Sequence, residues 1–204
     1  MTRPHVKICG LRRIEDAALA VESGARALGC VLASDSPRRA STSEARALVT
    51  AFGDHMPVVL VFRGATRDEV LQACERTGAR EVQLHESPES LCLELEERAL
   101  RVWRVLGVEG TALPTPCVTP DATRPLVLDS AHGGSGRSFD WSLLSQVPHP
   151  GVFVAGGITP DNVAALCAHD PYGIDLSSGV ESAPGVKDGA RMRALFANLK
   201  AAHR

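Results

Sequence analysis

The sequence predicts an α/β fold in which residues 1–204 form a single compact (β/α)8 barrel of the TIM type. Short apolar runs alternate with amphipathic stretches, which indicates βαβ units and a parallel sheet, and eight such runs fit a closed barrel better than an open sheet. The expected strands are 5–9, 27–32, 57–62, 80–84, 101–105, 125–129, 151–155 and 173–177. The expected helices are 13–22, 42–52, 67–77, 87–99, 139–145, 160–168 and 187–201.

Composition and charge exclude several classes of function. Hydrophobic residues make up 44% of the chain and charged residues 23%, as in ordinary globular proteins. The net charge of −2 and the presence of only two Trp and one Tyr do not favour a nucleic-acid or anionic-membrane partner. No run approaches the roughly 18 apolar residues of a membrane span, and no secretory signal is evident. We therefore expect a cytoplasmic protein.

The first expected strand ends on a reactive side chain. Successive strand residues face opposite sides, so Lys7 and Cys9 share one face and Val6 and Ile8 share the other. The face that packs on helices must be apolar, so Lys7 and Cys9 should point into the barrel near its top. A thiolate at Cys9 could act as a base if nearby positive charge, such as that of Lys7, lowers its pKa. The alternative is a buried cysteine that only packs.

The loop after the second expected strand carries Ser36, Pro37, Arg38 and Arg39. A guanidinium at this end of the barrel can hold a carboxylate through two hydrogen bonds. The alternative is a solvated surface charge.

The fourth and eighth expected strands also place polar side chains on one face. Gln83 and His85 share a face of the fourth, and Asp175 and Ser177 share a face of the eighth. Burying such groups in a barrel is costly unless they pair with each other or meet a polar ligand. They are therefore candidates for ligand contacts.

The connection from Gly107 to Pro125 should be a loop in place of a helix. Its prolines stand at 114, 116, 120 and 125, and proline removes backbone donors and breaks helices.

The sixth expected strand ends on Asp129, a lone carboxylate that could act as an acid or could cap the loop that follows. Gly134 lies in the glycine-rich segment 133–136 soon after it. Backbone N–H groups in such a loop can approach a ligand closely, although a plain turn is the alternative.

The loops after the seventh and eighth strands are typical of phosphate sites. In barrels of this kind these loops commonly hold phosphate with backbone N–H groups. The expected contact residues are Gly156, Gly157, Ser177, Ser178 and Gly179.

Metal and cofactor signals are weak. The six cysteines are scattered without a C-x-x-C pair, and His85, His132 and His169 lack ligand spacing. We expect no metal, no cofactor and no disulfide framework.

Taken together, the motifs resemble the phosphoribosylanthranilate isomerase family of tryptophan biosynthesis. They match in order over nearly the whole chain. The matching segments are Lys7-Ile8-Cys9-Gly10, Glu15-Asp16-Ala17, Ser36-Pro37-Arg38, Val82-Gln83-Leu84-His85, Leu128-Asp129, Gly133-Gly134-Ser135-Gly136, Phe139-Asp140-Trp141, the run 156–163, the run 175–181 and Gly185-Val186-Lys187-Asp188.

The resemblance implies a cofactor-free barrel that isomerises an aldose to a ketose by an Amadori rearrangement. The substrate would be N-(5-phosphoribosyl)anthranilate and the product 1-(2-carboxyphenylamino)-1-deoxyribulose 5-phosphate. Asp129 would be the general acid, Cys9 the general base, and Arg38 would hold the anthranilate carboxylate. The pKa of Asp129 would have to rise and that of Cys9 to fall. The remaining expected substrate contacts are Lys7, His85, Gly134 and Asp175.

Two other functions are kept as alternatives. One is another phosphate-binding barrel enzyme acting on a sugar phosphate, which a catalytic lysine at a strand end or a metal cluster would favour. The other is a non-catalytic barrel that only binds a phosphorylated ligand. The chain departs from the family at Glu86, where glycine is usual. In every case the expected partner is a small phosphorylated molecule, and the chain is expected to be a monomer or a homodimer.

Overall fold

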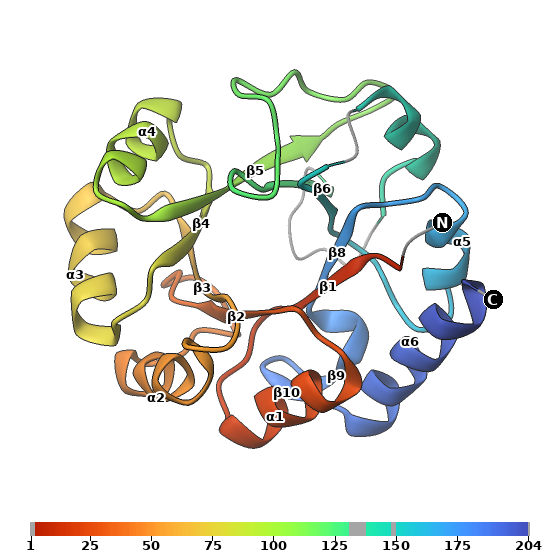
Figure 1. Ribbon diagram of the computed structural model, residues 1–204, viewed down its shortest axis with the longest axis horizontal. Helices are drawn as coiled ribbons and strands as arrows, with labels where there is room; N and C mark the ends of the chain where they lie inside the picture. The colour runs from red at the N-terminus through yellow and green to blue at the C-terminus, as the bar shows by residue number, and fades with distance from the viewer. Residues whose placement is uncertain (1–2, 131–137, 148–149, 204) are drawn as a thin grey trace.

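Eight parallel strands close into a barrel in the computed structural model, which describes residues 3–130, 138–147 and 150–203. Figure 1 looks along the barrel, with the strands as an inner ring and the helices outside it. The strands follow the chain order, and β8 pairs with β1 to close the ring. The barrel strands are β1 (His5–Ile8), β2 (Ala27–Val31), β3 (Val58–Arg63), β4 (Glu81–His85), β5 (Arg101–Val108), β6 (Leu126–Ser130), β7 (Val152–Val154) and β8 (Gly173–Leu176). The predicted α/β barrel is confirmed.

The helices begin and end where local side chains satisfy the backbone. Ser41 and Thr66 each form a capping box, which fixes the first turns of α2 and α3. Gly24 ends α1 in a left-handed conformation with φ 116°. The α-helices are α1 (Ile14–Ser23), α2 (Thr42–Phe52), α3 (Arg67–Thr77), α4 (Glu89–Glu97), α5 (Val163–Cys167) and α6 (Gly189–Ala202).

Two expected helices differ from their predicted form. The stretch predicted at 139–145 is a 3-10 helix, η1 (Trp141–Gln146), which begins after Asp140, whose side chain accepts from the Ser142 N–H. The helix predicted at 160–168 is reduced to α5, because the Asn162 side chain bonds to Thr159 N and Gly157 O and holds the preceding residues in a loop. The connection between β5 and β6 contains no helix, as the prolines predicted.

A small hairpin after β8 was not predicted. A 3-10 turn, η2 (Ser178–Val180), leads into β9 (Glu181–Ala183), which pairs antiparallel with β10 (Val186–Lys187). Lys187 was expected to start the last helix, but it lies in β10. The helix begins at Gly189 because the Asp188 side chain accepts from the N–H groups of Ala190 and Arg191.

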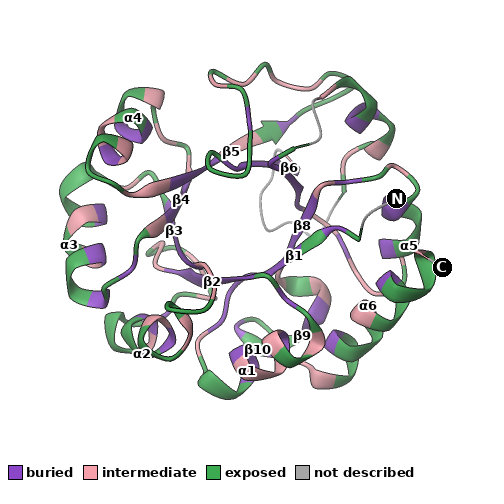
Figure 2. Cartoon of the chain, in the orientation of Figure 1, coloured by how far each residue is buried: buried purple, intermediate pink, exposed green. Residues whose placement is uncertain are grey.

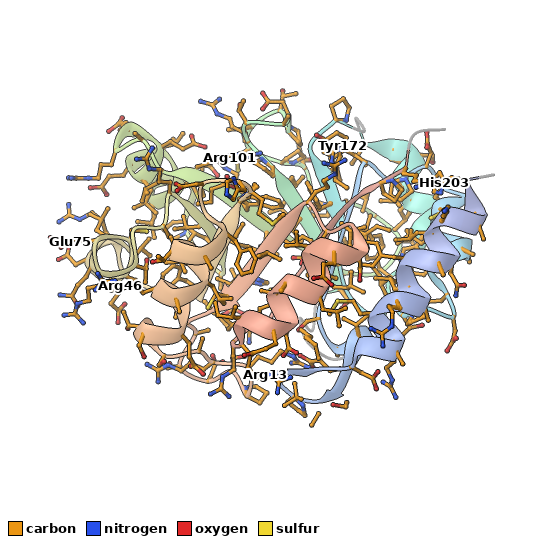
Figure 3. All side chains as sticks on the ribbon, turned by 60° about the horizontal axis from the view of Figure 1, so that its bottom comes forward. Arg13, Arg46, Glu75, Arg101, Tyr172 and His203 are labelled. Atoms are coloured by element: carbon orange, nitrogen blue, oxygen red, sulfur yellow. The ribbon has the colours of Figure 1, made fainter. Side chains whose placement is uncertain are left out.

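The barrel strands are buried on both faces (Figure 2). Outward side chains pack under the helices in the larger core. Charged side chains such as Arg46 and Glu75 cover the outer surface of the helical ring (Figure 3). Inside the barrel lies a smaller apolar cluster that reaches the strand carboxyl ends only at Ala155; its members are Ala27, Val59, Trp103, Val127, Phe153 and Ala155.

Trp103 is the largest member of that inner cluster. It is 2% exposed, its ring centroid lies 4.7 Å from that of Phe153, and its Nε1 donates to Glu81 at 2.7 Å. The cluster fills the barrel interior, and the polar side chains lie toward the carboxyl ends of the strands.

We predict that Trp103→Ala lowers the free energy of unfolding by about 3–5 kcal/mol, because it leaves a cavity in the barrel interior. Urea unfolding followed by circular dichroism measures the change. Leu93→Ala, at a side chain that is 45% exposed, is the control and should change stability by less than about 1 kcal/mol. Equal effects of the two substitutions would contradict this role of Trp103.

Candidate active site

The carboxyl ends of the strands surround a cavity of about 270 Å³. Most of the predicted site residues line it: Cys9, Arg38, His85, Asp129, Gly156, Gly157, Asp175, Ser177 and Ser178. Lys7 is fully buried beside this cavity, and Gly179 lies just behind its wall in η2. Gly134 lies outside the described residues. The alternation of strand residues predicted that these polar side chains point into the barrel, and the structure places them there.

Lys7 and Asp175 form a buried ion pair at the seam between β1 and β8. They are register partners, and the Nζ–Oδ2 distance is 2.8 Å. Although burial favours the neutral amine, Asp175 and then Cys9 hold the pKa of Lys7 above its ordinary value. The second oxygen of Asp175, Oδ1, is buried without a hydrogen-bond partner among the described groups. It is therefore an acceptor ready for a donor on a ligand.

Cys9 stands on the next inward position after Lys7 and is 9% exposed. Gly29 on β2 makes room for it, since a Cβ there would lie 2.7 Å from the Cys9 sulfur. Burial raises the pKa of the thiol, the Asp175 carboxylate adds to the rise, and the charges of Lys7 and Lys187 offset only part of it. The predicted fall in this pKa is therefore absent in the ligand-free protein, because desolvation outweighs the two cations.

Asp129 ends the apolar part of β6, three strands around the ring from β1, and is 8% exposed. Burial, followed by the negative charge of Asp175, raises the pKa of Asp129 to about 6. The predicted upward shift is present. Such a carboxyl keeps a proton that it can donate close to neutral pH.

His85 enters the cavity as a neutral imidazole. Burial and the charge of Arg63 lower its pKa to about 4. Its Nε2 lies 3.1 Å from Nε2 of Gln83, which shares its strand face. The next residue, Glu86, has φ 53°, a left-handed conformation that explains why glycine is usual there in the family it resembles.

Arg38 reaches the cavity from the loop after β2, but it is already engaged. Its guanidinium donates to both carboxylate oxygens of Glu181 on β9, with an Nη2–Oε2 distance of 2.8 Å. Sequence reasoning assigned no role to Glu181, although the residue belongs to the motif that follows β8. The signal that could have found it is a carboxylate standing just after a predicted anion-binding loop.

The loops after β7 and β8 meet at the cavity wall. Gly156 and Gly157 have φ values of 87° and 64°, which side chains rarely adopt. A Cβ added to Gly179 would collide with the backbone of Ile158 and Thr159, so the two loops touch at this point. These glycines leave the backbone N–H groups accessible to a ligand.

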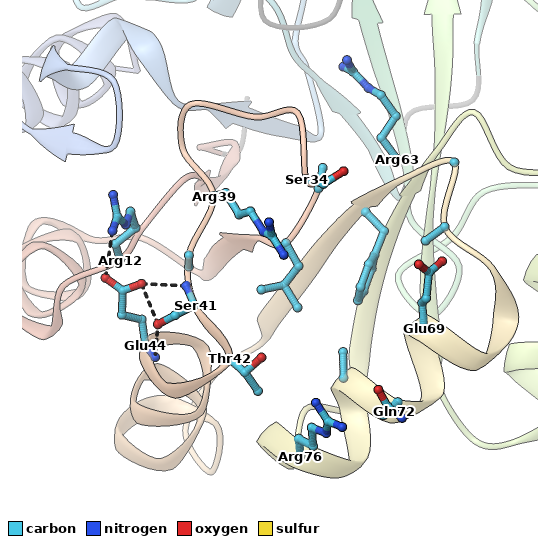
Figure 4. Close-up of a pocket in the computed structure, with 17 residues that line it drawn as sticks. Arg12, Ser34, Arg39, Ser41, Thr42, Glu44, Arg63, Glu69, Gln72 and Arg76 are labelled. Atoms are coloured by element: carbon cyan, nitrogen blue, oxygen red, sulfur yellow. Dashed lines mark hydrogen bonds and ion pairs between the residues drawn. The ribbon is translucent and has the colours of Figure 1, made fainter.

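A second hollow, about 770 Å³ in volume, lies outside the barrel between α2 and α3 and the loops before them (Figure 4). Its walls are mostly polar and include an ion pair between Arg12 and Glu44 at 3.2 Å. Although it is larger, it contains neither Cys9 nor Asp129. The smaller cavity at the strand ends is the one with acid and base chemistry.

Within the described ranges, no group of three or more His, Cys, Asp or Glu side chains is arranged to hold a metal ion. Among the same residues, no helix has the length and apolarity needed to cross a membrane.

A closed barrel with an acid, a thiol and two glycine-bearing loops around one cavity is typical of enzymes that act on small phosphorylated molecules. A family model described as N-(5'phosphoribosyl)anthranilate (PRA) isomerase matches residues 6–198. The chain belongs to this family.

Individual relatives agree with that assignment. The chain is 35% identical over 203 residues to N-(5'-phosphoribosyl)anthranilate isomerase of Pseudomonas fluorescens, which covers 96% of this chain and 95% of the relative. For the relative from Citrifermentans bemidjiense the identity is 38% over 199 residues, with 96% of each chain covered. The solved structure of phosphoribosyl anthranilate isomerase from Thermus thermophilus superposes with a TM-score of 0.86 at 40% identity, covering 97% of this chain and 98% of that one. The structure from Thermotoga maritima gives 0.81 at 30%, with 97% and 99% covered.

The raised pKa of Asp129 has a cost in stability. The folded protein binds this proton more tightly than the unfolded chain does, so stability falls as the pH rises from about 4 to about 6. We predict that Asp129→Asn, which stays neutral, is more stable than the wild type by about 1–3 kcal/mol at pH 8 and by much less at pH 4.

Urea unfolding at the two pH values tests this prediction. Asp35→Asn, at an exposed carboxylate on the rim of the same cavity, is the control and should show no such pH-dependent gain. A stability difference for Asp129→Asn that does not change between pH 4 and pH 8 would mean that the carboxyl is not destabilised by burial.

Proposed function

We propose that the protein converts N-(5-phosphoribosyl)anthranilate to 1-(2-carboxyphenylamino)-1-deoxyribulose 5-phosphate, a step of tryptophan biosynthesis. The observation that carries the proposal is the placement of Cys9 and Asp129 at strand ends around one cavity, on walls three strands apart. Family membership supports the same reaction. A further solved family member, 30% identical with a TM-score of 0.79, is described as a complex with reduced 1-(o-carboxyphenylamino)-1-deoxyribulose 5-phosphate.

In the proposed mechanism Asp129 gives its proton to the ribose ring oxygen. The C–O bond then breaks, and the electron pair on nitrogen forms a Schiff base with C1. The raised pKa of Asp129 suits this role, because the group is still partly protonated near neutral pH. A neutral donor buried beside Asp175 also leaves less negative charge in the cavity when the substrate anion binds.

Cys9 then removes the proton from C2 of the opened sugar, and the electron pair moves to give an enolamine. Tautomerisation of the enolamine gives the ketone. The base must be a thiolate at this stage, and the ammonium of Lys7 two residues away stabilises that charge.

The cavity lining offers one set of donors for each anionic group of the substrate. We assign the anthranilate carboxylate to Arg38 and the phosphate to the loops at 156–157 and 177–179. Asp175 Oδ1 and neutral His85 are then left to meet the sugar hydroxyl groups. No step requires a cofactor.

A cytoplasmic location and a monomeric or homodimeric state complete the proposal. One structural relative is described as monomers generated from a dimeric enzyme, so both states are compatible with the fold. Sedimentation equilibrium distinguishes them for this chain.

We expect Cys9→Ala and Asp129→Asn each to reduce kcat by about 10²-fold to 10⁴-fold or more, because each removes one proton-transfer group. Phosphoribosylanthranilate is generated in situ, and the decay of its fluorescence is followed after protein is added. Cys30→Ala, at a buried cysteine on the outward face of β2, is the control and should stay active.

Two outcomes would contradict the proposal at different levels. A folded wild type that does not exceed the spontaneous decay rate excludes the reaction. A fully active Cys9→Ala variant keeps the reaction but excludes the thiol as its base.

Gly179→Ala should raise KM by about tenfold or more with a smaller change in kcat, because the added Cβ pushes the two phosphate loops apart. Inhibition by inorganic phosphate should weaken in parallel. Gly64→Ala is the control for general damage: Gly64 has φ 56°, so alanine strains the backbone there, but the added Cβ meets nothing within 4 Å and lies outside the phosphate loops. Unchanged phosphate inhibition in Gly179→Ala would remove these loops from the phosphate site.

A further inference from the structure

Glu181, to which the proposed mechanism gives no role, is the centre of a buried polar cluster. It opens β9 directly after η2 and is 6% exposed. Arg38 Nε lies 3.1 Å from Oε1 and 3.0 Å from Oε2, and Arg38 Nη2 lies 2.8 Å from Oε2. The guanidinium therefore presents one whole edge to this carboxylate.

The other side of the Glu181 carboxylate is bound to the loop after β8. Lys187 Nζ lies 2.9 Å from Oε1, and the Ser177 hydroxyl and the Gly185 N–H each donate to Oε1 at 3.2 Å. Lys187 Nζ also donates to the Ser177 carbonyl at 3.2 Å and to its hydroxyl at 3.1 Å. One carboxylate thus links the Arg38 side chain to Ser177.

The hairpin that carries Glu181 and Lys187 is itself anchored. Lys187 N donates to the buried Asp16 carboxylate of α1 at 3.4 Å. A Cβ at Gly185 would lie 3.7 Å from Arg38 Cα and 3.8 Å from the Pro37 carbonyl, so the hairpin turn rests against the loop after β2. Figure 1 shows β9 and β10 beside α1.

The pairing leaves one donor group of Arg38 unused. Its Nη1 has no partner among the residues that the structure describes, while the side chain lines the cavity and is 16% exposed. The three charges of Arg38, Glu181 and Lys187 sum to one positive charge beside the cavity. Although burial favours the neutral acid, Arg38 and Lys187 hold the pKa of Glu181 below its ordinary value, so the carboxylate stays ionised.

We propose that Glu181 is a positioning residue: it orients Arg38 toward the aryl carboxylate of the substrate and, through Lys187, fixes Ser177 at the phosphate end. The hairpin β9–β10 then fixes how Arg38 and Ser177, which both contact Glu181 Oε1, lie relative to each other. This inference rests on the proposed function. The competing role is inhibitory, with Glu181 occupying Arg38 until the substrate displaces it.

Glu181→Gln distinguishes the two roles by the sign of its effect. The amide places an N–H₂ group against Arg38 or Lys187, so one of them must move. Under the positioning role KM rises by about tenfold while kcat stays within about threefold. Under the inhibitory role KM falls, because the substrate no longer competes with a carboxylate.

Two further variants test whether the effect comes from the orientation of Arg38, from a change in net charge or from a general loss of structure. The paired variant Glu181→Gln with Lys187→Met keeps the net charge of the wild type, and KM should still rise. Glu89→Gln is the matched control, because Glu89 holds Arg104 in the same bidentate geometry, at 3.0, 3.0 and 2.7 Å, away from the cavity. Its KM should not change.

A binding measurement tests the contact between Arg38 and the aryl carboxylate of the ligand separately from the other contacts. Calorimetry compares reduced 1-(o-carboxyphenylamino)-1-deoxyribulose 5-phosphate with the analogue that has a plain phenylamino group. Glu181→Gln should weaken the first by about tenfold more than the second, because only the first meets Arg38. Equal losses for both probes, or no loss, in a folded and active protein would overturn the inference and leave the proposed function intact. Absence of turnover by the wild type would instead remove the proposed function itself.

Discussion

The buried ion pair between Lys7 and Asp175 is the interaction on which the site depends. It joins register partners where β8 meets β1, so the pairing that closes the barrel also brings these two charges together. A lysine at 0% exposure needs a partner, and removing either member would leave a buried charge uncompensated. The pair also faces both proton-transfer groups, since the Asp175 charge raises the pKa of Asp129 and the Lys7 charge opposes the rise at Cys9.

The strands and their inward faces were predictable from local pattern. Alternation in β1, β4 and β8 requires that the apolar set faces the helices, and this leaves Lys7, Gln83, His85 and Asp175 no place but the barrel interior. The loop between β5 and β6 was equally predictable, because proline acts on the backbone at its own position. Structural features that depend only on residues a few positions apart can therefore be predicted from the sequence.

Features that arise from contacts across the chain were not predictable in this way. The engagement of Arg38 with Glu181 joins residues 143 positions apart, so local pattern does not predict the pairing, although a carboxylate just after a predicted anion-binding loop could have pointed to Glu181. The hairpin β9–β10 was missed for a similar reason, because Lys187 follows the pattern of a helix start until Asp188 caps the helix and Glu181 binds its ammonium. The pKa of Cys9 was predicted in the wrong direction, since residue types show neighbouring charges but not the depth of burial.

Burial favours catalysis at one of the two proton-transfer groups and opposes it at the other. It raises the pKa of both Asp129 and Cys9, which prepares the acid but keeps the base protonated. The charges around the two groups differ: Asp175 raises the pKa of both, but two ammonium groups, those of Lys7 and Lys187, oppose the rise at Cys9, whereas Arg63 is the charged group that opposes it at Asp129. The positive charge of the hairpin therefore lies on the side of the barrel where a negative charge must develop. If the charge were the same all around the ring, it would shift the pKa of both groups in the same direction and could suit only one of them.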